Sequence, residues 1–365
     1  MKGYRVVFDA PCKASLHEFE VRQPGAYEVQ IKVYYTLISA GTEKAQVSGS
    51  KNTARKFPAV PGYSSAGIVT AIGSSVTEFA VGDRVFAEYG GHASYCVQKT
   101  SKVVKIPDNV SFQEAVFTRV ASFPLLALRR ARLEIGESVV VVGLGMLGLF
   151  GVQLARAAGA FPTIAIGTST RPIRNEKAKE YGADLVVISK RLTDVLSEKE
   201  INKLSAEEKE QRQKELKREL IKEIKEYTMK TNCVSGANVV LEVSGNEDGF
   251  KTCLNYVSKR GRVVVNGCNR DDIHGFDLYG VMKNGTNIIG AHDMTRMPYN
   301  SAPGNWTAKR DYITLLGFMS DGRLKTKDMI SEYASPADCG KVYERLVNDR
   351  NFPLGVLFDW EHFDS

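Results

Sequence analysis

The stretch that decides the fold is "VVVVGLGMLGL", residues 139–149. Four β-branched valines in succession are typical of a strand that is buried on both faces of a parallel sheet. The run leads directly into a glycine turn of the pattern GxGxxG, at Gly143, Gly145 and Gly148, and then into a segment with helical spacing of apolar residues. The pattern is weak on its own, but between a buried strand and a helix it predicts a dinucleotide-binding site.

Each glycine has its own role in such a turn. We expect Gly143 to allow the tight bend, Gly145 to let a pyrophosphate approach the backbone, and Gly148 to let the helix pack closely on the strand. Met146 and Leu147, the first residues of the helix, would offer free N–H groups and the positive end of the helix dipole to the phosphates. A purely structural glycine turn is the alternative.

The next expected strand indicates which nicotinamide cofactor is bound. NAD sites usually place an acid about 20 residues after the glycine turn, where it binds the ribose 2′-hydroxyl. This chain has "GTSTRPIR" there, residues 167–174, and hydroxyl and guanidinium groups can bind a 2′-phosphate. The sequence therefore favours NADP, although a hydroxyl can also bond a plain ribose. The expected ligands are Thr168, Ser169, Thr170, Arg171 and Arg174.

The regions on either side of this site predict two domains. In the first part, β-rich runs such as "YEVQIKVYYTLI" (27–38) alternate with turns, which predicts a compact, mostly antiparallel β domain. A helix is expected from Ser111 onward. Beyond the glycine turn, strands alternate with helical segments, as in a right-handed doubly wound parallel sheet. The tail predicts a strand, a helix begun near Ser335 and a closing strand, in the style of the first domain.

A highly charged segment at 197–227 interrupts the alternation of strands and helices. Its apolar residues Leu216, Leu220, Ile221 and Ile224 form a narrow stripe on a predicted helix. We favour a solvated helix that docks by this stripe and is stabilised by acid–base pairs one turn apart. A subunit contact or an active-site flap is the alternative.

Bulk properties fit an ordinary enzyme. The chain has 365 residues, enough for two packed domains, and a net charge of +7. Its basic residues are mixed with acids, so nucleic-acid binding is not expected. No apolar run is long enough to cross a membrane and the start lacks a secretory signal, so a cytoplasmic location is the default expectation. The six cysteines form no close ligand pair, and we expect reduced thiols rather than zinc ligands.

The whole arrangement resembles the medium-chain dehydrogenase/reductase superfamily, which is alcohol dehydrogenase-like. The motifs that carry the resemblance include "PGYSSAGIVTAIGSSVTEFAVGDRV" (61–85), the glycine turn and "VVLEVSG" (239–245). It implies an α/β fold with a GroES-like β-rich catalytic domain (1–120 and 294–365) and a Rossmann domain with a doubly wound parallel sheet (121–293). It also implies homo-oligomers, since relatives are usually dimers or tetramers. Two serines are then expected at the cofactor, Ser122 and Ser244, and Ser122 can alternatively cap a helix turn.

Zinc-dependent members carry metal ligands at positions that hold other residues here. By the resemblance, the three catalytic ligand positions fall on Ala40 in "ISAGTE" (38–43), on Tyr63 and on Thr118. Methyl, phenol and neutral hydroxyl groups are poor zinc ligands. The four-cysteine lobe that binds structural zinc is absent too. The chain is therefore identified as a zinc-independent member.

Without a metal, a side chain has to take the proton of the alcohol while hydride leaves for the nicotinamide. Tyr63 is the first candidate, because it replaces a zinc ligand and because Arg119 could lower its pKa by stabilising the phenolate. Filling the vacated metal space is its alternative role. Glu43 replaces a family aspartate and is expected to orient its neighbours. His92 is either a titrating catalytic group or a hydrogen-bonded structural histidine.

The segment 292–312, "HDMTRMPYNSAPGNWTAKRDY", is unusually polar and aromatic. Such side chains can line a site for a polyhydroxylated or anionic substrate, with the indole stacking on a sugar face. An ordinary surface loop is the alternative, and the histidine can again be structural. The candidate substrate contacts are His292, Asn305, Trp306, Lys309 and Arg310.

Three functions are compatible with these residues. The leading hypothesis is an NADP- or NAD-dependent dehydrogenase for a secondary alcohol of a sugar, cyclitol or other polyol. The second is an NADPH-dependent enone or quinone reductase, the other main activity of zinc-free relatives. The third is a non-catalytic nucleotide-sensing protein, because the zinc ligands are lost without an obvious replacement base.

Overall fold

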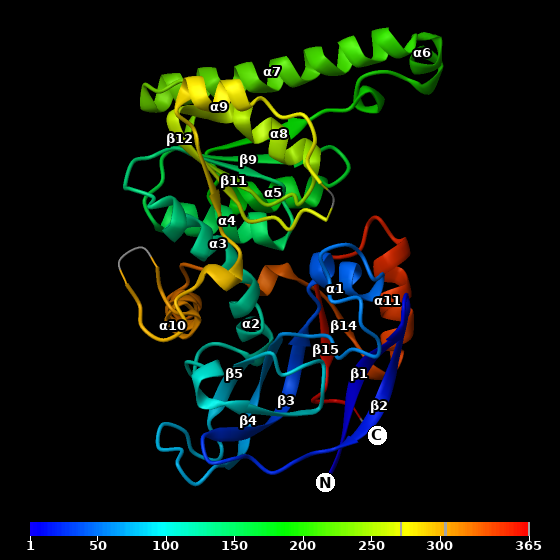
Figure 1. The fold of residues 1–365 in the computed structure, drawn as a ribbon, viewed down its shortest axis with the longest axis vertical. Coiled ribbons are helices and arrows are strands. Elements are labelled where there is room, and N and C mark those ends of the chain that lie inside the picture. The colour runs from blue at the N-terminus through cyan, green and yellow to red at the C-terminus, as the bar shows by residue number, and fades with distance from the viewer. Residues whose placement is uncertain (271, 303–304, 364–365) are drawn as a thin grey trace. The chain divides into compact units, whose positions relative to one another are not determined.

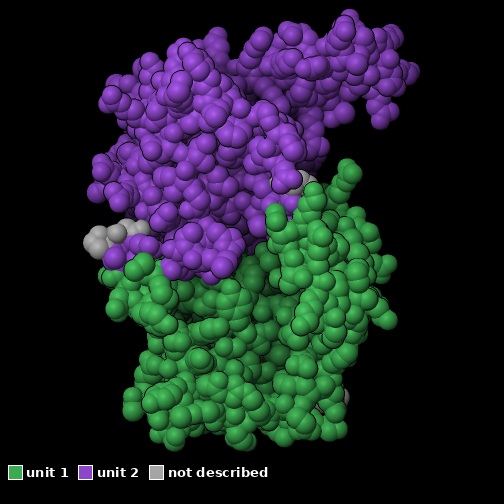
Figure 2. Space-filling model, in the orientation of Figure 1, with its two compact units in different colours: residues 1–122, 297–301, 306–365 green, residues 123–296, 302–305 purple. Residues whose placement is uncertain are grey.

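A computed structural model describes residues 1–270, 272–302 and 305–363 and places the valine run in β8 (Val139–Val142), which is buried throughout. The chain divides into two compact units (Figure 2). Unit 1 comprises Met1–Ser122, Met297–Ser301 and Trp306–Ser365, and unit 2 comprises Phe123–Arg296 and Ala302–Asn305.

Unit 2 is built on a parallel sheet with β8 near its middle, between the strands β9 and β11 that Figure 1 labels. Within the described residues the sheet has six strands in the order β10-β9-β8-β11-β12-β13, and each neighbouring pair is parallel. This order is that of the Rossmann fold, so the predicted doubly wound sheet is confirmed. The other strands are β9 (Thr163–Thr168), β10 (Leu185–Ser189), β11 (Ala237–Glu242), β12 (Val257–Val265) and β13 (Asn287–Gly290).

Helices connect these parallel strands. Such crossovers are needed because parallel strands cannot be joined by a tight hairpin. The chain enters unit 2 within α3 (Thr118–Ala131). The helices that follow are α4 (Met146–Ala157), α5 (Pro172–Glu180), α6 (Glu198–Lys203), α7 (Ala206–Asn232), α8 (Glu247–Tyr256) and α9 (Leu278–Asn284).

Unit 1 is the predicted β-rich domain. Among its described residues, a seven-stranded sheet runs β14-β15-β3-β4-β5-β7 with β6 also paired to β3, and a separate ribbon joins β1 to β2. All pairs are antiparallel except β14 with β15. The strands are β1 (Lys2–Ala10), β2 (Lys13–Glu20), β3 (Glu28–Leu37), β4 (Ser64–Ile72), β5 (Arg84–Glu88), β6 (Tyr95–Lys99), β7 (Val103–Lys105), β14 (Ile330–Ala334) and β15 (Gly355–Asp359).

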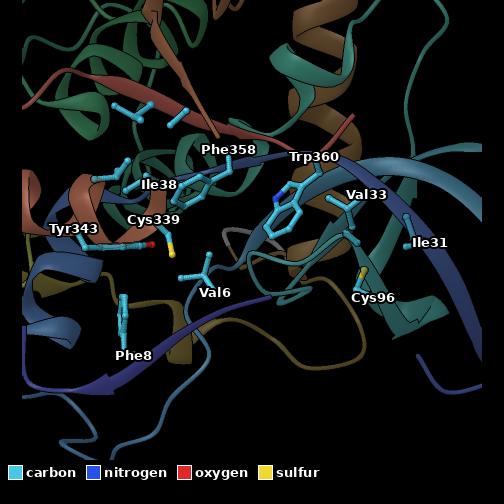
Figure 3. Close-up of a cluster of buried hydrophobic side chains, with 14 of the residues drawn as sticks. Val6, Phe8, Ile31, Val33, Ile38, Cys96, Cys339, Tyr343, Phe358 and Trp360 are labelled. Atoms are coloured by element: carbon cyan, nitrogen blue, oxygen red, sulfur yellow. The ribbon is translucent and has the colours of Figure 1, made fainter. Parts of the chain in front are cut away.

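The core of unit 1 joins residues from both ends of the chain. Val6 and Phe8 of β1 pack in one buried cluster with Tyr343, Phe358 and Trp360 from the tail (Figure 3). The rings of Phe8 and Tyr343 meet edge to face at 4.8 Å. The predicted return of the tail to the first domain is therefore observed. The helices of the unit are α1 (Ala40–Val47), α2 (Phe112–Ala115), α10 (Ala308–Ser320) and α11 (Cys339–Asn348).

Several local predictions are confirmed and others need correction. Ser111 caps α2 in a capping box with Glu114, as a serine start suggested. The single helix expected there is two helices, α2 and α3, separated at Val116 and Phe117. β2 and α1 were not anticipated. β2 is only partly buried and pairs with β1 alone, so the alternation of apolar and polar residues in its sequence is weak.

The charged segment is helical, but its main helix continues beyond the predicted end at 227. α7 reaches Asn232 and ends at Cys233 in the left-handed conformation, with a φ of 54°. Leu216, Leu220 and Ile224 are buried, as the stripe predicted. Leu220 and Ile224 pack into the core cluster of unit 2, which explains how so charged a helix is held.

Two further structural findings concern cysteines and membranes. All six cysteines are free thiols. None of the helices in the described part of the chain combines the length and the apolarity that a membrane crossing needs.

Ile224→Ala should destabilise unit 2, because Ile224 is fully buried between α7 and the sheet. Truncation of such a side chain costs about 2–5 kcal/mol. Urea unfolding followed by circular dichroism measures this loss. Glu223→Ala, an exposed change on the same helix, is the control and should stay within about 0.5 kcal/mol of the unsubstituted protein. Equal effects of the two changes would show that the stripe does not dock the helix.

Candidate active site

The glycine turn after β8 has the geometry that the sequence predicted. Gly143 has a φ of +103°, which side chains other than glycine rarely adopt. A Cβ atom at Gly148 would lie 1.8 Å from the Gly143 carbonyl oxygen, so only glycine allows α4 to pack this closely on the turn. The two glycines fix the point at which α4 begins.

Gly145 differs from these two because space is open beside it. It is the N-cap of α4, and a Cβ atom built there meets no described atom within 4 Å. The first N–H groups of α4, including those of Met146 and Leu147, have no partner within the helix. An open backbone at a helix N-terminus is where a pyrophosphate is bound in a dinucleotide site. The residues present therefore fit this part of the cofactor.

A loop after β11 is held beside the turn by Glu242, which the sequence reading did not single out. The Glu242 carboxylate is fully buried and accepts hydrogen bonds from Ser244 N at 2.8 Å and from Gly245 N at 3.0 Å. Ser244 lies against Gly143, so the predicted cofactor contact does adjoin the glycine turn. A glutamate at the end of a buried β-rich run was the available signal, since a buried carboxylate needs local donors.

The loop after β9 brings the predicted cation pair together. Burial lowers the pKa of the Arg174 guanidinium to about 10, and the charge of Arg171 adds to this effect. Two guanidinium groups that repel each other favour an anion between or beside them. Thr168 and Thr170 exchange a hydrogen bond at 3.1 Å, and Ser169 Oγ donates to Asp194 at 2.6 Å. The Ser169 hydroxyl is thus already engaged by a carboxylate.

In unit 1, Arg119 is buried although it carries a full charge. Its exposed fraction is 1%, and its guanidinium donates to Tyr312 Oη at 2.8 Å and to Tyr89 Oη at 2.9 Å. Glu88, itself nearly buried, lies 3.3 Å away and balances the charge. The guanidinium carbon also lies 5.8 Å from the centroid of the Tyr63 ring. Arg119 therefore sits in a cage of three tyrosines and one carboxylate.

Tyr63 differs from the phenolate base that the sequence suggested. Burial raises the pKa of its phenol to about 12, and the charge of Glu43 adds to the rise. Arg119 acts in the opposite direction, as expected, but burial outweighs it. The hydroxyl donates to Ser39 Oγ. Tyr63 is therefore a protonated, hydrogen-bonded phenol at neutral pH.

Glu43 and His92 lie in a second buried network, and both are fully inaccessible to solvent. His92 Nε2 lies 3.0 Å from Glu43 Oε2, and His92 Nδ1 lies 2.7 Å from Thr36 Oγ1. Tyr343 donates to the same Glu43 oxygen, and Trp360 Nε1 donates to Thr36 at 3.1 Å. Since the carboxylate only accepts, His92 donates to it through Nε2. Because Glu43 and His92 are buried, they can orient neighbouring groups but are not placed to contact a substrate.

Glu43 connects this network to Tyr63. Its other oxygen accepts from Ser39 N at 2.9 Å, and Ser39 Oγ accepts the hydrogen bond of the Tyr63 hydroxyl. The carboxylate thus fixes the N-terminus of α1, where Ala40 is the first residue. The sequence expectation of an orienting Glu43 has a direct structural basis here.

The positions that hold zinc in zinc-dependent relatives do not fit a metal. Ala40 carries only a methyl group, the Tyr63 hydroxyl is engaged by Ser39, and the buried Thr118 Oγ1 has no hydrogen-bond partner among the described residues. Among all the residues that the structure describes, no group of three His, Cys, Asp or Glu side chains is suited to hold a metal. The donor set lacks the nitrogen, sulfur and carboxylate ligands that zinc requires.

Three further residues predicted to bind cofactor or substrate make hydrogen bonds within their own unit. Ser122 Oγ donates to the Arg119 carbonyl oxygen at 2.7 Å within α3. This bond corresponds to the alternative role given above, in which Ser122 caps a helix turn. His292 Nδ1 accepts from Met294 N and caps a short 3₁₀ turn in unit 2. Lys309 is held by Glu78 at 3.0 Å and by a carbonyl oxygen, so its ammonium is structural.

Trp306 and Arg310 form a stacked pair in unit 1. The guanidinium carbon lies 3.6 Å from the centroid of the indole ring, which is a close cation–π contact. Asn305 belongs to unit 2, where its backbone pairs with that of Ala302. The carbonyl oxygen of its side chain is buried without a hydrogen-bond partner among the described residues.

Comparisons with known proteins identify the family of the chain. A family model described as an alcohol dehydrogenase GroES-like domain matches residues 25–121, and one described as a zinc-binding dehydrogenase matches residues 147–302. The chain belongs to the medium-chain, alcohol dehydrogenase-like superfamily of dehydrogenases and reductases. It is an enzyme of the dehydrogenase class. The second matched range contains none of the three positions 40, 63 and 118.

Individual relatives match most of the chain. D-guloside 3-dehydrogenase of Escherichia coli (strain K12) is 26% identical over 97% of this chain and 99% of its own length. Sorbitol dehydrogenase of Bacillus subtilis (strain 168) is 24% identical over 82% of this chain and 80% of its own. The crystal structure of galactitol-1-phosphate dehydrogenase from Escherichia coli matches with a TM-score of 0.76 and 18% identity, over 98% of this chain and 100% of that one. This last likeness concerns the fold.

Gly145→Ala should separate cofactor binding from stability. The backbone angles of Gly145 are accessible to alanine and the added methyl meets no described atom, so the unfolding free energy should change by less than about 1 kcal/mol. The same methyl occupies the approach to the helix N-terminus, and NADP⁺ or NAD⁺ affinity should fall by about tenfold or more, roughly 1.4 kcal/mol. Calorimetric titration measures the affinity.

Gly148→Ala is the matched comparison for this change. Its methyl would clash with the Gly143 carbonyl, so it should destabilise unit 2 by about 1–3 kcal/mol or more. Unchanged dinucleotide affinity in Gly145→Ala would show that the pyrophosphate does not lie at this turn.

Proposed function

We propose that this enzyme transfers hydride between a secondary alcohol of a sugar, cyclitol or other polyol and a nicotinamide cofactor, without zinc. The observation that carries the proposal is the buried Arg119 cage. It sets a fixed positive charge beside Tyr63, at one of the positions where the resemblance implies a zinc ligand. A buried cation with hydroxyl partners supplies electrostatic stabilisation to an oxyanion, which is the task of the metal in zinc-dependent members.

The dinucleotide would be held by the residues of unit 2 already described. Gly143, Gly145 and Gly148 with the N-terminus of α4 fit the pyrophosphate, and the loop after β9 fits the adenosine ribose. When bound, a nicotinamide accepts or donates hydride. The close pair of Arg171 and Arg174 supports NADP over NAD, because a 2′-phosphate would relieve their mutual repulsion.

The substrate class rests on relatives and on charge. D-guloside 3-dehydrogenase and sorbitol dehydrogenase are both named for polyhydroxylated substrates. Arg119 already has Glu88 as its counter-ion, so the cage provides no further cation to pair with a phosphate on the substrate. A neutral polyol suits such a site better than a phosphorylated one.

The activity is tested by incubating the purified enzyme with NADP⁺ or NAD⁺ and a panel of sugars, cyclitols and polyols, and in reverse with the corresponding ketones. We expect turnover that a strong zinc chelator leaves unchanged, together with far less than one zinc per chain by elemental analysis. Stoichiometric zinc whose removal abolishes turnover would contradict the zinc-free part. Turnover with enones or quinones alone would favour the reductase alternative, and tight cofactor binding without any turnover would favour a nucleotide sensor.

Cofactor preference is tested with Arg171→Gln and Arg174→Gln. Each change removes a charged hydrogen-bond donor to a 2′-phosphate, a contact of about 1.5–3 kcal/mol, so NADP⁺ affinity should fall by roughly 10- to 100-fold. NAD⁺ affinity should stay within about threefold, and it serves as the internal control. Parallel losses for both cofactors would show that the two arginines do not distinguish the ribose 2′ position.

A further inference from the structure

The two phenols that accept hydrogen bonds from Arg119 have different surroundings. Tyr312 is 1% exposed and its ring packs edge to face on Phe86 at 5.2 Å. Tyr89 is 48% exposed. Its oxygen accepts from Arg119, and no described residue accepts the proton of its own hydroxyl. Tyr89 therefore presents a proton to the outside of the cage, while Tyr312 is enclosed within it.

The backbone of Tyr89 is strained, and its neighbours hold it. Its φ of +58° lies in the left-handed region, which costs a bulky residue about 1–3 kcal/mol. Tyr89 N donates to Tyr63 O at 3.1 Å and Gln98 Nε2 donates to Tyr89 O at 2.8 Å, which keeps this conformation. The strain directs the ring from the end of β5 toward Arg119 and Tyr63, whose ring centroid is 6.4 Å away. Strained residues of this kind are concentrated at functional sites.

Two cationic side chains lie close to Tyr89. Arg119 donates directly to the phenol oxygen, and the Lys102 ammonium lies 5.0 Å from the centroid of the ring. Glu88 is the acid next to this group, and it is paired with Arg119. Because a guanidinium only donates, the Arg119 N–H can keep its hydrogen bond to the Tyr89 oxygen whether or not that oxygen carries its proton. Tyr63, by contrast, donates a hydrogen bond to Ser39 and is buried away from solvent.

We propose that Tyr89 is the acid–base residue of this enzyme, with Arg119 as the group that positions it and stabilises its phenolate. The proposal rests on the proposed polyol dehydrogenase function and names a residue that the sequence reading did not identify. In ketone reduction the carbonyl carbon receives hydride from the reduced cofactor, the C=O π pair moves to oxygen, and that oxygen takes the Tyr89 hydroxyl proton. The phenolate keeps its hydrogen bond from Arg119 and regains a proton from water, and alcohol oxidation follows the same steps in reverse.

The test compares Tyr89→Phe with Tyr312→Phe, because each removes one phenol oxygen from the same guanidinium. Tyr89→Phe should lower kcat by about 10²- to 10⁴-fold, the usual range for loss of a general acid or base. Its remaining ketone reduction should fall about tenfold for each unit of rising pH, because hydronium ion must then supply the proton. NADP⁺ affinity and the melting temperature, neither of which depends on turnover, should stay close to those of the unsubstituted enzyme.

Tyr312→Phe should show the opposite pattern. It leaves Arg119 with one acceptor fewer in a closed interior, so the melting temperature should fall, while kcat should drop by less than about tenfold and keep its original pH profile. If the unsubstituted enzyme turns over a polyol or ketone and Tyr89→Phe retains its kcat and pH profile, Tyr89 is not the acid–base residue, although the dehydrogenase function stands. If the unsubstituted enzyme turns over none of these substrates, the proposed function itself fails and this proposal fails with it.

Discussion

The burial of one charge, that of Arg119, sets the chemistry of unit 1. A guanidinium removed from water must find acceptors, because an unpaired buried charge costs several kcal/mol. The acceptors come from distant parts of the chain: Glu88 and Tyr89 at the end of β5, and Tyr312 in α10, 193 residues beyond Arg119. The cage therefore holds α10 against the β domain, and it places three phenols around a fixed positive charge.

A second buried hydrogen-bond network joins the first and last parts of the chain. The Glu43 carboxylate accepts hydrogen bonds from Tyr343 and His92, and the Thr36 hydroxyl accepts one from Trp360. These bonds span 300 residues between Glu43 and Tyr343 and 324 residues between Thr36 and Trp360. Because each acceptor is inaccessible to water, losing any one partner would leave a polar group unsatisfied. The tail is thereby a structural part of the domain that begins the chain.

The fold was largely predictable because its signals are local. The valine run, the glycine turn and the alternation of strands and helices in unit 2 are read from neighbouring residues, and the confirmed sheet follows from them. The chemistry of unit 1 was less accessible, since it depends on contacts between residues far apart in the chain. Tyr63 was identified from its position, but the burial that raises its pKa to about 12 is a property of the folded core. Tyr89 gave no signal at all, because neither its positive φ nor its contact with Arg119 is encoded in a local pattern.

The discontinuity of unit 1 has a consequence for the order in which the protein is made. Unit 2 lies almost entirely between Phe123 and Arg296, so its residues leave the ribosome as one block and can fold while synthesis continues. Unit 1 has to wait for α11 and β15, since Tyr343 and Trp360 complete its core. During that interval β3 lacks the neighbour that β15 later provides, and an unpaired strand edge of this kind invites pairing with other chains. The nascent first domain therefore exposes this edge of β3 until the tail of the chain has been made.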